Sequence, residues 1–469
     1  MTETLQQAAE TAKKHHARPI ISAVLADGTI VETIHRPEEH RTLFAVGKDT
    51  DFRYETSLLA DGERLVPYSP RNNLLRNEVV LLPSEPTEYE TDEALVAEIT
   101  SFIHRFVDVS PLFEKVASYY VLLSWVYDAF SELPYLRLRG DPGSGKTRFL
   151  LTVGSLCYKP IFASGASTVS PLFRILDAFR GTLVIDEGDF RLSDERAEIV
   201  KILNNGNARG FPVLRSEAAP SGEYNPTAYA VFGPKLVATR GFFEDRALES
   251  RCLTEEMGLS RLREDISISM PAGYKAEALA LRNKLLLFRL RNRFKHQAVE
   301  EFVDRAIEPR LNQIFVPLLS IIEDPKTRGD LRELARRYNR ELAAERGMGV
   351  EAQVLEVIRD LLAQGEGRLP LKDVTSWFSD RHGEDYDRKI TTKWIGSVIR
   401  KRLRLAAHKT HGESVIPLSE VPKLKVLFER YGVSTTETGG DHMPAGDLGD
   451  MGDFVEGRGT PEPPQEPLS

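Results

Sequence analysis

Eight consecutive residues decide the fold of this chain: Gly140-Asp141-Pro142-Gly143-Ser144-Gly145-Lys146-Thr147. They match G-x-x-x-x-G-K-[ST] at every fixed position, between a strand-like segment, residues 135–139, and an apolar helix expected over residues 148–157. Glycines let consecutive backbone N–H groups turn around phosphate oxygens, and a helix N-terminus favours an anion. The stretch therefore predicts an ATP phosphate site, in which Lys146 reaches the β- and γ-phosphates and the Thr147 hydroxyl ligates Mg²⁺.

A strand that ends in two acids supplies the second half of this site. Residues 181–185 are mostly apolar, as in a buried parallel strand, and Asp186 and Glu187 follow them. Alone this pattern is common, but here it follows a complete phosphate loop by about 40 residues. Asp186 is predicted to hold Mg²⁺, and Glu187 to orient and polarise the attacking water.

Two arginines follow a third apolar strand, residues 235–238. Arg251 is the first candidate, and Arg246 the second, for a side chain that reaches the nucleotide of a neighbouring subunit. There an arginine stabilises the charge that develops on the phosphoryl oxygens. For either arginine alone, a surface salt bridge to a nearby acid is an equally good interpretation.

The combined pattern resembles the AAA+ motors of plasmids, phages and integrated mobile elements. These are superfamily 3 helicases and their relatives with a hairpin before the first sensor. The resemblance covers roughly residues 93–325. Besides the two phosphate-site motifs, it is carried by residues 202–210, Ile-Leu-Asn-Asn-Gly-Asn-Ala-Arg-Gly, and residues 245–252, Asp-Arg-Ala-Leu-Glu-Ser-Arg-Cys. It implies an α/β P-loop NTPase with a three-layer αβα core and a helical lid, which hydrolyses ATP between the subunits of a homo-oligomeric ring, expected to be a hexamer.

The resemblance also assigns two further residues. Thr239, at the end of the third strand, corresponds to the polar sensor of the γ-phosphate, although a threonine that only caps its strand is nearly as good an interpretation. Superfamily 3 enzymes usually carry asparagine there, so the resemblance holds for the broader group. In the helical lid, Arg310 is the candidate for a second sensor, and Arg282 competes for this role.

A hairpin is expected from residues 212–217 and 227–232, which are strand-like and joined by a loop dense in turn-forming residues. In the related motors such a hairpin enters the central pore and moves along DNA. Arg215 and Tyr224 are therefore candidate DNA contacts, the tyrosine by stacking on a base. The tip carries Glu223 and neither lysine nor arginine, so a plain surface hairpin remains an alternative.

The C-terminal region predicts a winged helix. Three helices are expected, over residues 354–362, 371–381 and 391–405, followed by a β-hairpin over residues 405–417. Residues 388–412 contain eight bases and no acid, which favours contacts to DNA phosphates, with a protein-binding winged helix as the alternative. The candidate DNA contacts are Lys389, Lys393, Arg400, Lys401, Arg404 and Lys409.

The whole chain is predicted to divide into five segments: a small N-terminal β-rich accessory domain (1–82), the ATPase core (83–258), the lid (259–348), the winged helix (349–432) and an acidic tail (433–469). The tail carries −7 of the net charge of −8, so the rest of the chain is nearly neutral. No run of about 20 apolar residues and no apolar N-terminal run occurs, which predicts a cytoplasmic protein without a membrane partner.

These features together predict an ATP-dependent DNA motor, either a replicative helicase or a replication initiator of a mobile element. Two other classes remain open. One is a DNA-binding regulatory or defence ATPase without unwinding activity, which the absence of lysine and arginine from the hairpin tip favours. The other is an ATPase that remodels proteins and uses the winged helix as an adaptor.

Overall fold

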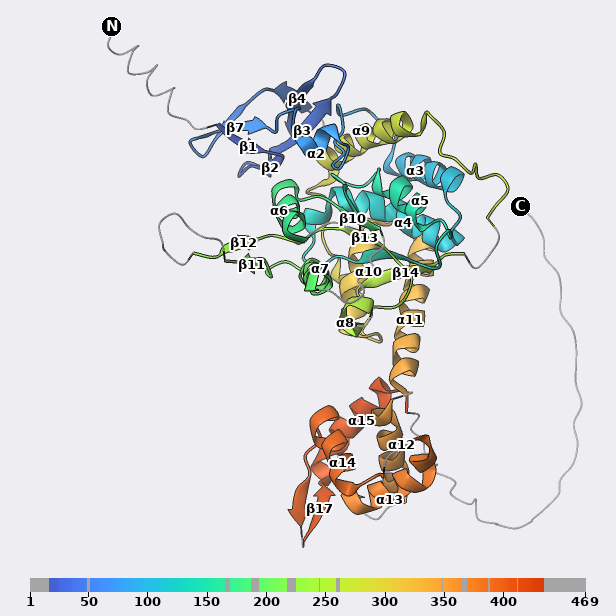
Figure 1. The fold of residues 1–469 in the computed structure, drawn as a ribbon. Helices are drawn as coiled ribbons and strands as arrows, with labels where there is room; N and C mark the ends of the chain where they lie inside the picture. The colour runs from blue at the N-terminus through green and yellow to red at the C-terminus, as the bar shows by residue number, and fades with distance from the viewer. Residues whose placement is uncertain are drawn as a thin grey trace, which may run out of the picture. The chain divides into compact units, whose positions relative to one another are not determined.

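The chain forms two compact units, Met1–Glu341 and Leu342–Ser469, coloured from blue to red along the sequence in Figure 1. The predicted division into five segments is finer than this, and nearly all of the predicted tail lies outside the described residues. The computed structural model describes residues 17–48, 51–164, 169–186, 194–216, 225–243, 245–258, 262–347, 349–364, 369–386, 389–410 and 412–433.

The centre of the first unit is a parallel sheet of five strands, in the order β14-β8-β13-β10-β9. The strands are β8 (Tyr135–Arg139), β9 (Ile161–Ser164), β10 (Leu183–Asp186), β13 (Lys235–Thr239) and β14 (Cys252–Glu256). Three helices follow β8, β9 and β10 in turn: α5 (Lys146–Gly154), α6 (Val169–Phe179) and α7 (Asp194–Asn205). Crossover helices between parallel strands bury the sheet, which explains the mostly apolar sequences of β9 and β10 and the buried residues of β13. This mixed α/β architecture fits the predicted P-loop NTPase core.

Two helices precede β8. The first, α3 (Asp92–Phe106), buries an apolar stripe of five side chains: Leu95, Ile99, Phe102, Ile103 and Phe106. The next helix is α4 (Pro111–Trp125), after which the chain continues as the 3₁₀ turn η1 (Tyr127–Ala129). Arg289 donates a hydrogen bond of 2.6 Å to the Trp125 carbonyl, one of the last carbonyls of α4.

The N-terminal part is β-rich. An antiparallel sheet has the order β2 (Ser22–Val24), β3 (Ile30–Arg36), β4 (Arg41–Lys48) and β5 (Asp51–Glu55). A second sheet has the order β1 (Ala17–Ile20), β7 (Glu63–Pro67) and β6 (Leu58–Ala60), and the short helix α2 (Asn73–Arg76) follows. The turn at Asp27-Gly28 joins β2 to β3, and Gly28 has φ 84°. The turn at Asp61-Gly62 joins β6 to β7.

A buried charge network ties this sheet to the rest of the first unit. Glu32 of β3 is only 1% exposed and forms ion pairs with Lys159 at 2.9 Å and Arg289 at 2.7 Å. Arg289 also donates two hydrogen bonds to Asp128, at 2.9 and 3.0 Å. Removing one partner of such a network leaves the others buried without compensation. The N-terminal sheet is thus an integral part of the first unit.

Helices complete the first unit where the lid is predicted. These are α9 (Tyr274–Asn292), η2 (Glu300–Phe302), α10 (Pro309–Ile321) and α11 (Pro325–Gly347), which crosses into the second unit. Before them lie the hairpin strands β11 (Val213–Arg215) and β12 (Thr227–Tyr229) and the short helix α8 (Arg246–Glu249). Figure 1 shows the hairpin projecting from the body of this unit.

The second unit has three helices, then a hairpin, then a further helix. Its elements are α12 (Val350–Ala363), β15 (Leu369–Pro370), α13 (Leu371–His382), η3 (Gly383–Asp385), α14 (Thr392–Ser397), the π-helical turn η4 (Val398–Arg402), β16 (His408–Thr410), β17 (Glu413–Ile416), η5 (Leu418–Glu420) and α15 (Val421–Arg430). The strands form an antiparallel sheet in the order β15-β17-β16, and one apolar core joins helices and sheet. The predicted hairpin is present, shifted so that Lys409 lies within β16. In the described part of the chain, no helix is long and apolar enough to cross a membrane.

Candidate nucleotide site

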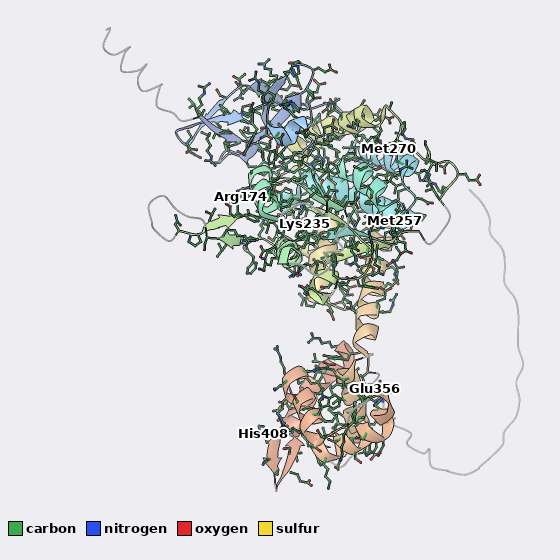
Figure 2. The ribbon with its side chains drawn as sticks, in the orientation of Figure 1. Arg174, Lys235, Met257, Met270, Glu356 and His408 are labelled. Atoms are coloured by element: carbon green, nitrogen blue, oxygen red, sulfur yellow. The ribbon has the colours of Figure 1, made fainter. Side chains whose placement is uncertain are left out.

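The glycine loop joins β8 to α5 at the carboxyl end of the sheet. Gly145 precedes α5 with φ 94°, a conformation that costs other residues free energy. At Gly140 a Cβ atom would come within 2.4 Å of the carbonyl oxygen of Met257, which is labelled in Figure 2. The Lys146 ammonium donates hydrogen bonds to the carbonyl oxygens of Gly140 at 2.6 Å and Asp141 at 2.7 Å. The loop thus holds a lysine ammonium at the N-terminus of a helix, and both the cation and the helix end favour an anion.

The two predicted metal ligands lie together. The Thr147 hydroxyl donates a hydrogen bond of 2.6 Å to Oδ2 of Asp186, although the residues stand 39 positions apart. Thr147 belongs to the first turn of α5, and Asp186 is the last residue of β10. A hydroxyl and a carboxylate oxygen beside a phosphate loop are the hard ligands that Mg²⁺ prefers, so the residues fit this ion. Glu187, the predicted partner of the attacking water, lies outside the described residues.

Thr239, the last residue of β13, lies between the glycine loop and Asp186 because β13 separates β8 from β10 in the sheet. Its carbonyl accepts a hydrogen bond from the Gly140 N–H at 3.2 Å, so the end of β13 touches the start of the loop. The side chain is only 2% exposed, and among the described residues its hydroxyl has no hydrogen-bond partner. Buried hydroxyls without a partner are uncommon in folded proteins. The Thr239 hydroxyl lies where a bound group could become its hydrogen-bond partner.

Arg251 lies at the other end of the sheet. It directly precedes β14, and its carbonyl accepts a hydrogen bond of 3.0 Å from the Tyr135 N–H, at the start of β8. The glycine loop follows the last residue of β8, roughly 13 Å away along the strand. The Arg251 guanidinium donates hydrogen bonds to the side chain of Asn204 and to the Ala247 carbonyl. Arg251 therefore makes no contact with the glycine loop of its own chain.

Two supporting contacts were not predicted. Asn204 of α7 accepts from Arg251 and donates to Asp245 at 2.6 Å, so one amide orients the arginine and the start of α8. The fully buried Arg137 of β8 forms an ion pair with Glu249. The Asn-Asn-Gly of residues 204–206 was the only sequence signal for the first contact. The partners of both contacts are too distant in sequence for any local pattern to reveal them.

The remaining candidates near α8 are placed as follows. Arg246 is the first residue of α8, and its side chain is outside the described part. Arg310, in the first turn of α10, lies close to Arg251: burial, and then the charge of Arg310, lower the pKa of Arg251. Arg282, the competing second-sensor candidate, is wrongly placed for that role. It donates to the Ser155 carbonyl at 2.8 Å, just past the end of α5, roughly 13 Å along the helix from the loop.

The hairpin candidates receive less support. Arg215 of β11 forms an ion pair with Glu198 of α7, and its guanidinium lies 4.8 Å from the ring centre of Phe173. Tyr224 lies outside the described residues, as does most of the loop at the tip. The base of the hairpin presents two apolar side chains to solvent, Phe211 at 68% and Leu214 at 64% exposure.

The basic candidates of the second unit are all exposed: Lys389, Lys393, Arg400, Lys401, Arg404 and Lys409. None of the six has an ion pair with a described residue, whereas their neighbour Arg402 pairs with Glu351 at 3.3 Å. They lie before, within and just after α14 and η4, and on β16. An anionic surface could therefore meet these cations without displacing an internal partner.

Comparisons with known proteins place the chain only distantly. No family model matches it, and no curated protein is similar enough in sequence to match. Its structure is similar to the C-terminal region of NrS-1, with 11% identity, 82% of this chain and 96% of that chain covered, and a TM-score of 0.34. A full-length MCM homolog from Methanopyrus kandleri matches at 13% identity over 66% of this chain and 73% of that one, with a TM-score of 0.33. The JCV helicase matches at 13% identity over 54% and 62%, with a TM-score of 0.23. Likenesses at this distance carry no functional conclusion, which rests on the site itself.

Proposed function

We propose that this protein is a Mg²⁺-dependent ATPase of the AAA+ type that works as a motor on DNA. The observation that carries the proposal is the 2.6 Å contact between the Thr147 hydroxyl and Asp186, beside a glycine loop closed around Lys146. Three residues from two elements converge where a nucleotide phosphate and its metal ion need them. A tight turn with an incidental lysine would not require the carboxylate.

Each residue then has a role in hydrolysis. Lys146 leaves the loop carbonyls and binds the β- and γ-phosphates, while Thr147 and Asp186 hold Mg²⁺. The bound ion supplies neutralisation of the charge that develops on the phosphate oxygens. Glu187 polarises the attacking water, and the Thr239 hydroxyl finds its missing partner in the γ-phosphate or that water.

The position of Arg251 supports a site shared between subunits. Because it lies at the far end of the sheet from its own loop, it reaches a nucleotide only on a neighbouring copy of the chain. Arg310 lies close to Arg251 and is proposed to contact the same nucleotide, with Arg246 as the alternative finger. A finger that acts in trans at every site requires a closed assembly, for which a hexameric ring is proposed.

The second unit is proposed to be a winged helix that anchors DNA. Its element order, helix–strand–helix–helix–strand–strand, supports this motif, and the bases that have no ion pair with a described residue lie around the third helix and on the wing strand β16. The motor is proposed to serve replication of a mobile element, as a helicase or an initiator.

One experiment tests the core of this proposal. The ATPase rate of the full chain is measured with and without single-stranded DNA, with Lys146→Ala as the blank. Hydrolysis that DNA stimulates and the substitution abolishes is the expected result. No hydrolysis above the blank would overturn the ATPase, whereas hydrolysis indifferent to DNA would overturn the DNA motor alone.

A second candidate function is remodelling of a protein partner. The exposed Phe211 and Leu214 at the base of the hairpin favour it, because paired apolar side chains suit a polypeptide better than a phosphate backbone. Phe211→Ser/Leu214→Ser separates the two functions. A DNA motor keeps its DNA-stimulated hydrolysis in this variant.

A further inference from the structure

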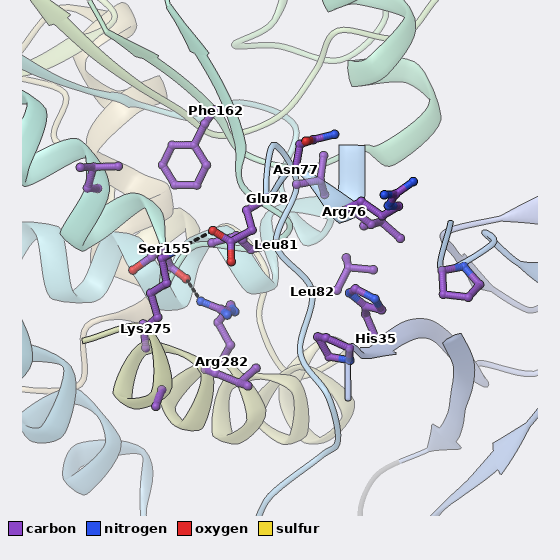
Figure 3. A pocket seen from close by; sticks show the side chains of 18 of the residues that line it. His35, Arg76, Asn77, Glu78, Leu81, Leu82, Ser155, Phe162, Lys275 and Arg282 are labelled. Atoms are coloured by element: carbon purple, nitrogen blue, oxygen red, sulfur yellow. Dashed lines mark hydrogen bonds and ion pairs between the residues drawn. The ribbon is translucent and has the colours of Figure 1, made fainter. Parts of the chain in front are cut away.

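A cavity of about 1080 Å³ lies in the first unit, away from the glycine loop. One side is the N-terminal region around His35 and α2, and the other is the start of α9 and the end of α5 (Figure 3). The proposed ATPase cycle uses none of its lining residues. A cavity of this volume is large enough for a ligand the size of a nucleotide.

The charged side chains of the lining are mostly basic. Glu78 is the single acid among the lining residues, and it already forms an ion pair with Lys275 of α9. The basic and imidazole side chains that line the cavity are His35, His40, Arg71, Arg76, Lys275 and Arg282. The lining therefore carries an excess of positive charge even when both histidines are neutral.

Arg282 is the most unusual of these groups. It is only 6% exposed, and its sole hydrogen bond to a described residue is donated by Nη1 to the Ser155 carbonyl at 2.8 Å. Its Nε has no hydrogen-bond partner among the described residues, and none of their carboxylates forms an ion pair with it. Burial lowers the pKa of this guanidinium to about 10. A buried guanidinium is normally paired, so an anion that entered the cavity would supply what the chain does not.

The remaining wall is apolar. Leu75 and Leu82 line it from the N-terminal side, Phe162 from β9, and Leu151 and Leu279 from α5 and α9. An inorganic anion would leave this wall facing water. A ligand with an apolar or planar body and an anionic group uses both parts of the lining.

We propose that this cavity binds a small organic anion, with a phosphate or carboxylate held by Arg282 and an apolar or planar body against the leucine wall. The site is separate from the glycine loop. Ser155 follows the last residue of α5, whereas Lys146 and Thr147 form its first turn, so one helix connects the two sites. The proposal holds whether or not the chain acts on DNA.

The test uses the full chain with Lys146→Ala, so that the glycine loop is disabled. Adenosine monophosphate, 2-naphthoate and inorganic phosphate are titrated separately by calorimetry. Two variants change the cavity: Arg282→Gln, and the exposed pair Arg71→Gln/Arg76→Gln, whose folding is not at risk. Lys284→Gln is the matched control, because this cation lies on the same helix but pairs with Glu98 outside the cavity.

At least one of the two organic anions is expected to bind once per chain and more tightly than phosphate. Both cavity variants should weaken binding about tenfold or more, and the control should not. Binding of the monophosphate alone identifies a nucleotide-like ligand, and binding of naphthoate a carboxylate. Absence of binding by both organic anions, binding that both cavity variants leave unchanged, or phosphate binding as tight as theirs would overturn the proposal.

Discussion

Arg251 and Lys146 lie at opposite ends of the same parallel sheet. Lys146 follows the carboxyl end of β8, whereas the Arg251 carbonyl bonds to the first residue of that strand. Side chains so separated cannot serve one nucleotide within one chain, since an arginine side chain extends only about 7 Å and four strand residues span roughly 13 Å. The proposed finger must therefore act between chains.

Mixing two inactive variants tests this arrangement. Lys146→Ala keeps the finger and loses the phosphate site, and Arg251→Ala does the reverse. Each alone should hydrolyse ATP at less than about 1% of the wild-type rate. In rings assembled at random from equal amounts of the two variants, about a quarter of the interfaces pair an intact loop with an intact arginine. The mixture should therefore recover about a quarter of the wild-type ATPase rate. Mixed rings that form, as shown by differently tagged copies, yet stay inactive would contradict a trans role.

The contact between Thr147 and Asp186 predicts a loss specific to the metal ion. Asp186→Asn should lower the ATPase rate by roughly 100-fold, because the amide oxygen is neutral and a weaker ligand for Mg²⁺. Nucleotide affinity measured in a chelator should stay within about twofold of wild type, while the gain in affinity on adding Mg²⁺ disappears. The exposed Asp265→Asn is the control. A variant that still binds the nucleotide more tightly with Mg²⁺ would show that Asp186 is no ligand.

Thr239→Val should separate activity from stability. The hydroxyl is buried without a partner among the described residues, so its loss should change the free energy of unfolding by no more than about 1 kcal/mol. The ATPase rate should fall about tenfold if this hydroxyl serves the reaction. Thr152→Val is the matched control, since the Thr152 hydroxyl on α5 is equally buried and equally unpartnered. Equal ATPase rates in the two variants would mean that the Thr239 hydroxyl has no role in the reaction.

The parts of the site that could be predicted are those whose constraint is local. The glycine loop needs a fixed spacing over eight residues, and Asp186 needs only an apolar strand before it. The Asn204–Arg251 and Arg137–Glu249 contacts could not be predicted, because they join residues 47 and 112 positions apart.

The order of the strands in the sheet is a second feature that could not be predicted from the sequence. The hydrophobic pattern of a segment predicts that it is a strand, but not which strands lie beside it in the sheet. The sequence pattern therefore does not reveal that β13 separates β8 from β10. That order places Thr239 between the loop and Asp186. Likewise, the helical pattern predicts α9 but not the elements against which this helix packs. Arg282 was therefore a plausible sensor in sequence and lies elsewhere in the structure.

The ion pair between the half-buried Asp128 and the buried Arg289 predicts a pH dependence of stability. Burial opposes the charge on Asp128, but Arg289 and Arg293 outweigh burial and hold the pKa of its carboxyl well below its usual range. A depressed pKa means that the unfolded chain takes up the proton first, so the stabilisation is present above about pH 4 and is lost as the pH falls. Asp128→Asn should lower the free energy of unfolding by about 3 kcal/mol at pH 7.

Chemical unfolding at several pH values checks this expectation. The difference between Asp128→Asn and wild type should shrink from pH 6 to pH 3, because the wild type loses what the variant already lacks. The exposed Asp51→Asn should follow the wild type throughout. A difference that stays constant over this range would mean that the charge of Asp128 contributes nothing.

The exposed bases of the second unit predict the salt dependence of DNA binding. Each phosphate contact that releases a counterion contributes about 0.9 to the slope of log affinity against log salt on duplex DNA. Lys393→Gln/Lys401→Gln should therefore reduce that slope by about 2, and should weaken binding to unrelated sequences equally, because phosphate contacts carry no sequence information. Lys372→Gln/Lys425→Gln removes the same charge from exposed positions of this unit outside the basic window, and should leave the slope nearly unchanged. An equal reduction by both pairs would mean that the net charge of the unit, and not this face, draws it to DNA.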